Sequence, residues 1–418
     1  MFAASGPPGV PTVFDPAPLR EPSGTLATLW QALLLHPVTL FALRQLFASP
    51  RIAGIRVISH YDDAREALSR PDVFGVPWLA KMHMLAPSKE PFVLATDAPG
   101  VHACGERRVM EVFRYDDTAR IASIAAATAN LVLEQPGPDL DVVQGLILPV
   151  ATAVYQQHYG IETPPDLALW LMAMSTFTFR QIGADPAMQT NALAAAVKVA
   201  AVLATAITRA KANPGLSDTI VDRLLALQCR APGRFPNDAL TSTLTGMVSG
   251  YAPVGTTAAV NILEVLLSKP KALEATRQAA RDNDERLTQH LLEALRFKPI
   301  NPGLFRVCQT DYTLAANTAR ATDIRQGEHV IVLLQSAMQD ESRLPHAWRF
   351  DPERPASQSM VFGYGMHWCV GAPLGMAQLL PMLRPLLLRG FRRTTGQAGK
   401  TRLFGSFPEH LSLTLGRG

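Results

Sequence analysis

The sequence lacks paired cysteines and internal repeats, and these absences exclude several classes of protein. The four cysteines of the 418-residue chain lie far apart, so no C-x-x-C pair is available for a zinc cluster or a dithiol redox site. This cysteine usage fits a reducing compartment, and we expect a cytoplasmic protein. The absence of repeats argues against a solenoid or propeller.

Long apolar runs and blocks of like charge are also missing. The apolar stretch 29–47 is interrupted by Gln31, His36, Pro37 and Arg44, whereas a membrane span needs about 20 nearly continuous apolar residues. We therefore expect an amphipathic helix pair there and no transmembrane segment. The N-terminus has no basic region followed by an apolar core, so no signal peptide is expected. The net charge is +4 without Lys/Arg blocks, which gives nucleic-acid binding no support.

The pattern of the remaining residues indicates a globular, mainly α protein with a small β region. Residues 1–24 are rich in proline and glycine and are expected to form an extended arm, whereas no linker divides 25–418, which we interpret as a single domain. Residues 55–59 alternate as a strand does, and 61–68 have helical spacing. Residues 75–96 lack a period and predict a long functional loop. From about 120 to 235 the pattern is helical.

One stretch, 362–371, reads F-G-Y-G-M-H-W-C-V-G and precedes a run with helical spacing. Cys369 therefore lies at a helix start, where backbone N–H groups stabilise a thiolate. A single thiolate suits heme iron better than zinc, which needs four ligands. Phe362 can shield the sulfur, His367 can donate to a propionate, and Gly365 and Gly371 let the backbone approach a flat macrocycle. The alternative is a buried structural cysteine in a glycine-rich turn.

The pattern Phe362-x-x-Gly365-x-His367-x-Cys369-x-Gly371 resembles the heme-binding signature of the cytochrome P450 family. The resemblance implies the mainly α P450 fold, heme b as cofactor and Cys369 as the iron ligand. It also implies that His102, Arg107 and Arg306 bind the heme propionates. The family has an arginine one turn after the histidine, where this chain has Glu106, so either the helix shifts locally or Arg107 reaches the propionate from a different angle. The alternative is that Arg107 belongs to a solvated, charged helix start.

Two further motifs support the resemblance. Glu293 and Arg296 lie on one face of a predicted helix, as in the family's E-x-x-R pair, and Arg349 matches the arginine that completes a buried network. A carboxylate between two guanidinium groups must be well hydrogen-bonded to be tolerated inside a protein. We expect these three side chains to be buried within hydrogen-bond reach of one another.

The distal helix, expected over 238–268, departs from the family. Its oxygen-activating members have an acid followed by threonine, a pair that relays protons, but this chain has no Asp or Glu between Asp238 and Glu264. If Thr256 supplies the alcohol, glycine takes the acid position; another register places Val254 at the alcohol position. Pro253 should kink the helix and free the carbonyl of Ser249, either unpaired or bound to water. The residues assigned to catalysis are Thr256, Pro253 and Ala252.

The resemblance implies oxidation of a largely apolar small molecule, most simply by monooxygenation with a ferredoxin-type redox partner. The missing acid leaves open a peroxide-using enzyme, or one that rearranges a hydroperoxide or another oxidised substrate. A heme sensor or carrier without turnover is the alternative from another class. The residues expected to line the substrate pocket are Trp78, Met82, Tyr251, Leu304 and Phe407, beside Ala252 and Thr256.

Overall fold

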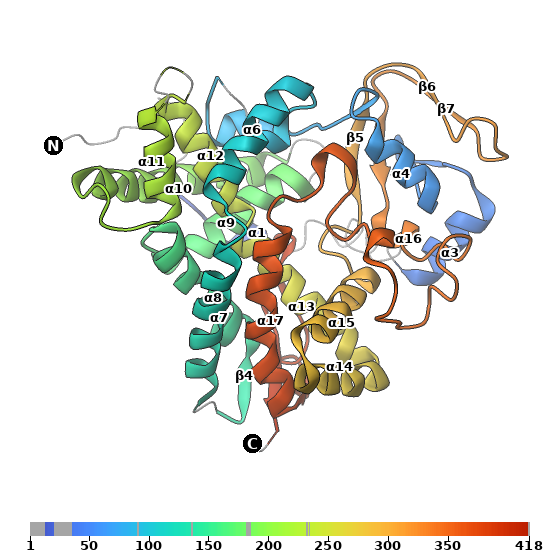
Figure 1. Cartoon of the computed structure of the whole chain (residues 1–418). Helices are drawn as coiled ribbons and strands as arrows, with labels where there is room; N and C mark the ends of the chain where they lie inside the picture. Colours follow the sequence, from blue (N-terminus) through green and yellow to red (C-terminus); the bar gives the residue numbers. More distant parts are fainter. Residues whose placement is uncertain are drawn as a thin grey trace.

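The computed structural model describes residues 13–20, 36–89, 92–134, 137–180, 185–230, 233 and 235–416 (Figure 1). Helices form the larger part of these residues, and β5, β6 and β7 are grouped at the upper right of Figure 1. The predicted fold class, mainly α with a small β region, is confirmed.

Helices lie where the sequence predicted them at 61–68, within 120–235 and within 238–268, and further helices were not anticipated, Pro270–Asp282 among them. The α-helices are α1 (Ala17–Arg20), α3 (Pro37–Leu46), α4 (Tyr61–Ser69), α5 (Leu79–Leu85), α6 (Pro99–Val112), α7 (Asp117–Glu134), α8 (Leu148–Val154), α9 (Leu167–Ser175), α10 (Pro186–Ala212), α11 (Ile220–Arg230), α12 (Asn237–Ser249), α13 (Ala252–Ser268), α14 (Pro270–Asp282), α15 (Asp284–Phe297), α16 (Leu334–Ala337) and α17 (Ala372–Arg389). Three turns of π-helix adjoin two of the shorter helices: one precedes α8, one follows α8 and one follows α9. These turns are η2 (Val143–Ile147), η3 (Tyr155–Tyr159) and η4 (Thr176–Arg180).

The largest sheet has five strands in the order β1-β2-β8-β5-β3. Strands β2 and β8 are parallel, and the other neighbours in this sheet are antiparallel. The strands are β1 (Arg51–Ile52), β2 (Ile55–Ile58), β3 (Phe74–Gly75), β4 (Asp139–Asp141), β5 (Leu304–Cys308), β6 (Tyr312–Leu314), β7 (Thr322–Ile324), β8 (His329–Val332), β9 (Phe391–Arg393), β10 (Arg402–Phe404), β11 (Phe407–His410) and β12 (Ser412–Leu415). Strand β5 presents Leu304 and Arg306 to the candidate site described below.

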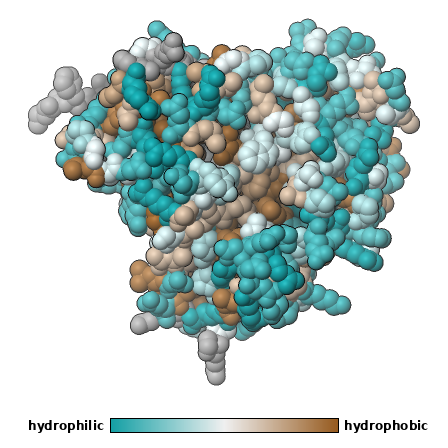
Figure 2. Space-filling model, in the orientation of Figure 1, coloured by the Kyte–Doolittle hydropathy of each residue, from teal (hydrophilic) through white to brown (hydrophobic). Residues whose placement is uncertain are grey.

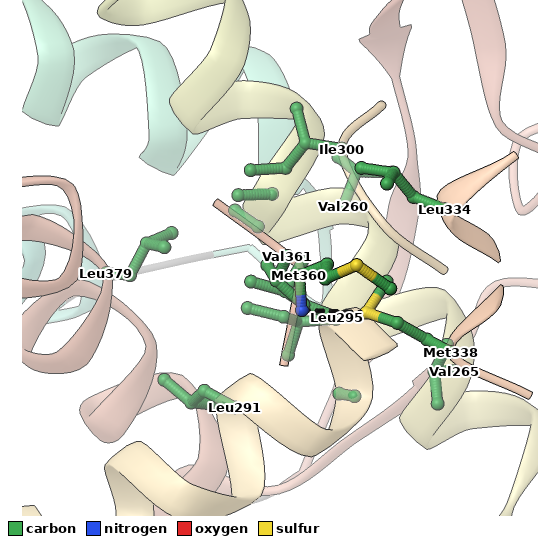
Figure 3. Close-up of a cluster of buried hydrophobic side chains, with 14 of the residues drawn as sticks. Val260, Val265, Leu291, Leu295, Ile300, Leu334, Met338, Met360, Val361 and Leu379 are labelled. Carbon is green, nitrogen blue, oxygen red and sulfur yellow. Dashed lines mark hydrogen bonds between the residues drawn. The ribbon is translucent and has the colours of Figure 1, made fainter. Parts of the chain in front are cut away.

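A buried apolar cluster fixes the frame beneath that site. In Figure 3, Val260 of α13, Leu291 and Leu295 of α15, Met338 and Met360 lie around one core. Val260, Leu295 and Met360 are fully buried, and each large side chain removed from water contributes about 1.5–3 kcal/mol. Because Met360 comes two residues before Phe362, the core also anchors the start of the glycine-rich turn.

Three predictions about the N-terminal third need correction or fall partly outside the described residues. Most of the arm 1–24 is outside; in the described part, Ala17–Arg20 is helical, and Phe14 packs on Phe404 with ring centroids 6.3 Å apart, so this part is not extended. Of the helix pair predicted within 29–47, only α3 lies in the described residues. The predicted loop 75–96 contains the helix α5. Trp78, directly before this helix, packs edge-on against Phe179 with 5.5 Å between ring centroids.

Two helical stretches are long and apolar enough to cross a membrane by length and composition. They are Pro186–Ala212 and Asn237–Ser268, and 44% and 67% of their most apolar windows are buried inside the protein. Core helices of globular proteins meet the same criteria, so these stretches are weak support for a membrane span. Figure 2 shows one face of the molecule, which is largely hydrophilic with hydrophobic residues gathered across its middle.

Candidate functional site

Cys369 lies in a tight turn that ends at the first residue of α17. Its backbone N–H donates to the carbonyl of Phe362 at 2.9 Å, and the N–H of Ala372 donates to the Cys369 carbonyl at 3.1 Å. Burial raises the pKa of the Cys369 thiol, while the backbone N–H groups of Gly371 and Ala372 oppose that rise. The exposed surface of Cys369 faces an internal cavity whose lining it joins. The sulfur is thus open to a ligand in the cavity and screened from bulk water.

The two glycines that bracket Cys369 serve different purposes. A Cβ atom on Gly371 would lie 3.8 Å from the sulfur, and Gly371 is part of the cavity lining. Gly365 has a φ of +71°, and a Cβ there would lie 2.4 Å from the carbonyl oxygen of Leu68 at the end of α4. The expectation that Gly365 makes room for a macrocycle is therefore wrong. Its backbone conformation and its contact with α4 require glycine.

A group of buried cationic and imidazole side chains lies at one side of the same cavity. Nε2 of His367 is 2.8 Å from Oδ1 of Asp97, while Nδ1 of His367 is buried without a partner among the described residues. Arg306 is 4% exposed and donates to the carbonyl of Phe305 at 2.8 Å. Burial lowers the pKa of Arg306 to about 10, and the Asp97 carboxylate opposes this shift. The unpartnered nitrogen and the buried guanidinium suit an anionic group in the cavity.

His102 and Arg107 differ in how they are placed. The His102 ring is buried and packs edge-on against His367, 5.0 Å between centroids. Arg107 is exposed and lies outside the cavity lining. Glu106 occupies the position one turn after His102, with Oε2 4.0 Å from Nδ1. The structure therefore contradicts the prediction that Arg107 reaches a propionate, because Arg107 is exposed and does not belong to the cavity wall that contains Arg306 and His367.

The distal helix is broken between α12 and α13, and the break is bridged by side chains. Tyr155 Oη donates to the carbonyl of Val248 at 2.6 Å and accepts from the N–H of Ala252 at 3.1 Å. Ser175 Oγ of α9 donates to the carbonyl of Ser249 at 3.1 Å. The predicted kink is confirmed by the interruption at Gly250 and Tyr251. The expectation that the Ser249 carbonyl is unpaired or bound to water is wrong, because a hydroxyl of α9 reaches it.

We expect Tyr155→Phe to lower the free energy of unfolding by about 1–3 kcal/mol, because it leaves the buried N–H of Ala252 without a partner and removes the shorter of the hydrogen bonds to the Val248 carbonyl. Tyr159→Phe is the matched control, since Tyr159 is equally buried on the same π turn and its hydroxyl has no partner among the described residues. Urea unfolding of both variants measures the difference. Equal losses in the two variants would show that the Tyr155 bridge does not stabilise the break.

The residues that α13 and its start present to the cavity are Tyr251, Val254, Gly255 and Ala258. Thr256, Pro253 and Ala252, which the sequence assigned to catalysis, are buried and lie outside the cavity lining. Thr256 Oγ1 instead donates to the carbonyl of Ala252 at 2.8 Å. The geometry favours the register in which Val254 occupies the alcohol position. In that register the chain has neither the acid nor the alcohol, so no acid–alcohol pair faces the cavity.

The cavity has a volume of about 310 Å³ and a predominantly apolar lining. Of the seven residues predicted to line a substrate pocket, Ala252 and Thr256 lie outside its wall and the other five belong to it, namely Trp78, Met82, Tyr251, Leu304 and Phe407. The polar members that sequence reasoning missed include Arg180 at the end of η4 and Gln378 on α17. Gln378 is 2% exposed, and its Oε1 has no partner among the described residues. The only signal in the sequence was a polar residue within an apolar run, as for Gln378, or at the end of one, as for Arg180.

The buried ionic network differs from its prediction in one member. Glu293 accepts two hydrogen bonds from Arg296, each 2.8 Å, and a third from the N–H of Asp351 at 2.9 Å. Arg354 Nε lies 3.6 Å from Oε1 of Glu293. Arg349 is exposed and stacks over the Trp348 ring, and only its carbonyl contacts Arg296. The prediction for the Arg349 side chain is wrong, and Arg354 provides the second guanidinium.

The donor set fits heme. One thiol faces the cavity, Phe362 and Gly371 lie beside it in the lining, and Arg306 and the free nitrogen of His367 are available to anionic substituents. A planar macrocycle bound through a thiolate and carrying two carboxylates satisfies all of these groups. The residues that would hold it are Cys369, Phe362, Gly371, His367 and Arg306, with the His102 ring packed against His367.

Comparisons with known proteins agree with this fit. The profile of the cytochrome P450 family matches residues 271–408. The chain is similar to the mycinamicin IV hydroxylase/epoxidase of Micromonospora griseorubida, with 28% identity over 47% of each chain. It is also similar to the cytochrome P450 monooxygenase PikC of Streptomyces venezuelae, with 26% identity over 65% of this chain and 61% of the relative. The matched segments thus span less than two thirds of these relatives' lengths.

A solved structure of a P450 EryK mutant in complex with erythromycin B has the same fold. It superposes with a TM-score of 0.76, covering 93% of this chain and 97% of that chain, at 20% sequence identity. At this identity the likeness establishes the fold and leaves the ligand undetermined.

Proposed function

Because this chain belongs to the cytochrome P450 family and resembles its bacterial members, we propose that it is a heme-thiolate monooxygenase of a largely apolar small molecule. The observation that carries the proposal is the placement of Cys369, whose sulfur opens into the apolar cavity beside two backbone N–H groups. Heme bound through a thiolate supplies the electron donation that favours O–O cleavage.

The protein's own side chains position the substrate and exclude water. Aromatic and aliphatic groups of α5, β5 and β11 enclose the cavity, and they favour an apolar molecule by removing its surface from water. Ser249 Oγ and Tyr251 Oη lie in the lining and have no partner among the described residues. We propose that these hydroxyls hold water that carries protons in place of the missing acid.

A second candidate function is peroxide-dependent oxidation, and the distal helix favours it. No carboxylate belongs to the described cavity lining, and Thr256 is turned toward its own helix. Peroxide is dioxygen that already carries two electrons and its protons, so an enzyme that uses it has less need of a proton relay. The same holds for an enzyme that rearranges a hydroperoxide. A heme sensor or carrier without turnover is the third reading. Single-turnover assays with peroxide, and with dioxygen plus a reduced partner, separate the three.

We expect Thr256→Ala to reduce product formation by less than about tenfold, because the hydroxyl is bound to Ala252 and half of the usual pair is absent. Thr256→Val controls for packing, since it removes only the hydroxyl from this fully buried position. The measurement is product per heme with peroxide alone and with dioxygen plus electron donor. A large loss in both variants, with strict dependence on reductant, would show that Thr256 runs an ordinary relay.

Partners and location follow as parts of the same proposal. If dioxygen is the oxidant, we propose a ferredoxin-type redox partner, as cytochromes P450 usually need a source of electrons. We propose a cytoplasmic location, which agrees with cysteines that are all free in the described residues. Residues 25–418 are proposed to act as a single domain, since the cavity wall draws on positions from Val76 to Phe407.

A further inference from the structure

The cavity wall carries cationic groups without a matching carboxylate. Among the described residues that line it there is no aspartate, glutamate or lysine, and the two arginines are Arg180 and Arg306. Arg306 lies with His367 on the side that suits the heme carboxylates. Arg180 has no such role, and it lies in a wall that is otherwise mainly apolar.

Arg180 is the last residue of η4 and belongs to the cavity wall. Its Nη2 donates to the carbonyl of Ile300, and its Cζ lies 5.8 Å from the centre of the Phe407 ring. No carboxylate of the described residues pairs with it. Arg223, by contrast, binds the carboxylate of Asp117 at 2.6 Å.

An arginine in this position has unused hydrogen-bonding capacity. The guanidinium has five N–H donors, and a single carbonyl leaves most of them free. Burial lowers the pKa of Arg180 to about 10, so the group is still charged at neutral pH. A desolvated cation without a counter-charge is unfavourable, and a planar carboxylate satisfies it through two parallel hydrogen bonds. The site is therefore suited to an oxyanion of the cavity's occupant.

We propose that Arg180 binds a carboxylate of the substrate, and that the substrate class is amphipathic carboxylic acids. The apolar body of such a molecule would pack against Trp78, Met82, Leu304 and Phe407, and its carboxylate would bind Arg180. This inference rests on the proposed function, because it takes the cavity to be the substrate site.

The test compares ligands that differ only in charge. Octanoate, decanoate and dodecanoate are titrated into the heme-loaded protein beside the alcohols of the same chain lengths, at fixed ionic strength. Dissociation constants come from calorimetry and from the change in heme absorbance. In the wild type we expect each acid to bind at least about tenfold more tightly than its alcohol, because only the acid pairs with the buried guanidinium.

Arg180→Gln and Arg180→Met remove the charge at similar volume, and each should bring acid and alcohol within about twofold of one another. Arg209→Gln is the matched control: Arg209 is a half-exposed arginine of α10 that pairs with Glu162, and its loss should leave the preference unchanged. The heme content and the carbon monoxide spectrum of each sample are recorded alongside.

Equal binding of acids and alcohols by the wild type would overturn the proposal, as would a preference that persists in both Arg180 variants. Loss of heme from both variants would place Arg180 in the heme site or the fold, and would also overturn it. A wild type that lacks the thiolate-type carbon monoxide band would instead contradict the proposed function, whatever the acids do.

Discussion

Replacing Cys369 by alanine is expected to abolish the thiolate-type absorbance of the ferrous carbon monoxide complex, together with product formation. Cys369 is the cysteine in the wall of the cavity, and its sulfur is held between the turn and the first N–H groups of α17. No other side chain of the described lining offers a thiolate, so heme that still binds in the variant must do so without this ligand. The measurement is the difference spectrum of the reduced protein with and without carbon monoxide.

Cys229→Ala is the control for general effects of losing a thiol. Cys229 is exposed on α11, outside the cavity lining, and its replacement should leave spectrum and turnover unchanged. If the thiolate-type band persisted in Cys369→Ala, the iron ligand would be another residue and the assignment of the site would fail.

The second large effect concerns Glu293. Glu293→Ala should lower the free energy of unfolding by about 3–5 kcal/mol, because it leaves Arg296 and Arg354 buried without their carboxylate. The hydrogen bond from the Asp351 N–H, 2.9 Å long, is lost as well, which loosens the segment that leads to the glycine-rich turn. Denaturant unfolding and heme content measure the two consequences.

Glu274→Ala provides a matched comparison. Glu274 also pairs with an arginine three residues later on a helix, Arg277 at 3.4 Å, but its side chain is 66% exposed. Its loss should change stability by less than about 1 kcal/mol. Similar costs for Glu293→Ala and Glu274→Ala would mean that burial adds nothing to the first pair.

The same experiment distinguishes the two candidate third members of the network. Arg354→Ala should destabilise the protein more than Arg349→Ala, because the Arg354 side chain is 10% exposed and lies near Glu293, whereas Arg349 contributes only a backbone carbonyl. The opposite order would restore the interpretation drawn from the sequence.

Features that depend on neighbouring residues were predictable from the sequence. The turn around Cys369 and the Glu293–Arg296 pair each lie within one short segment, so type and spacing of residues were enough to identify them. The kink near Pro253 was predictable for the same reason, since a proline within a continuous helical run removes one of its hydrogen bonds, whereas a proline in the first turn of a new helix does not.

Features that depend on the direction of a long side chain were not predictable. Arg349 and Arg354 stand in one segment, and only the packing of that segment decides which of them turns inward. Arg107 is directed outward by the register of α6. Arg180 ends an apolar helical run, where a solvated arginine is the usual outcome, and its position in the cavity wall follows from the π turn η4 and the contact with Ile300.

The bridge at the helix break has a consequence for how the enzyme opens. An interrupted helix is often taken as a hinge, but here the amides at the break are occupied: Gly250 and Tyr251 donate to carbonyls of α12, and Ala252 donates to Tyr155. Ser175 ties the same point to α9. These hydrogen bonds hold the bend in place. The movement that admits a ligand must therefore come from segments that lack such hydrogen bonds. A ligand that shifts α9 would act directly on this bend through the Ser175 hydrogen bond. We therefore expect α9 and the distal helix to move together.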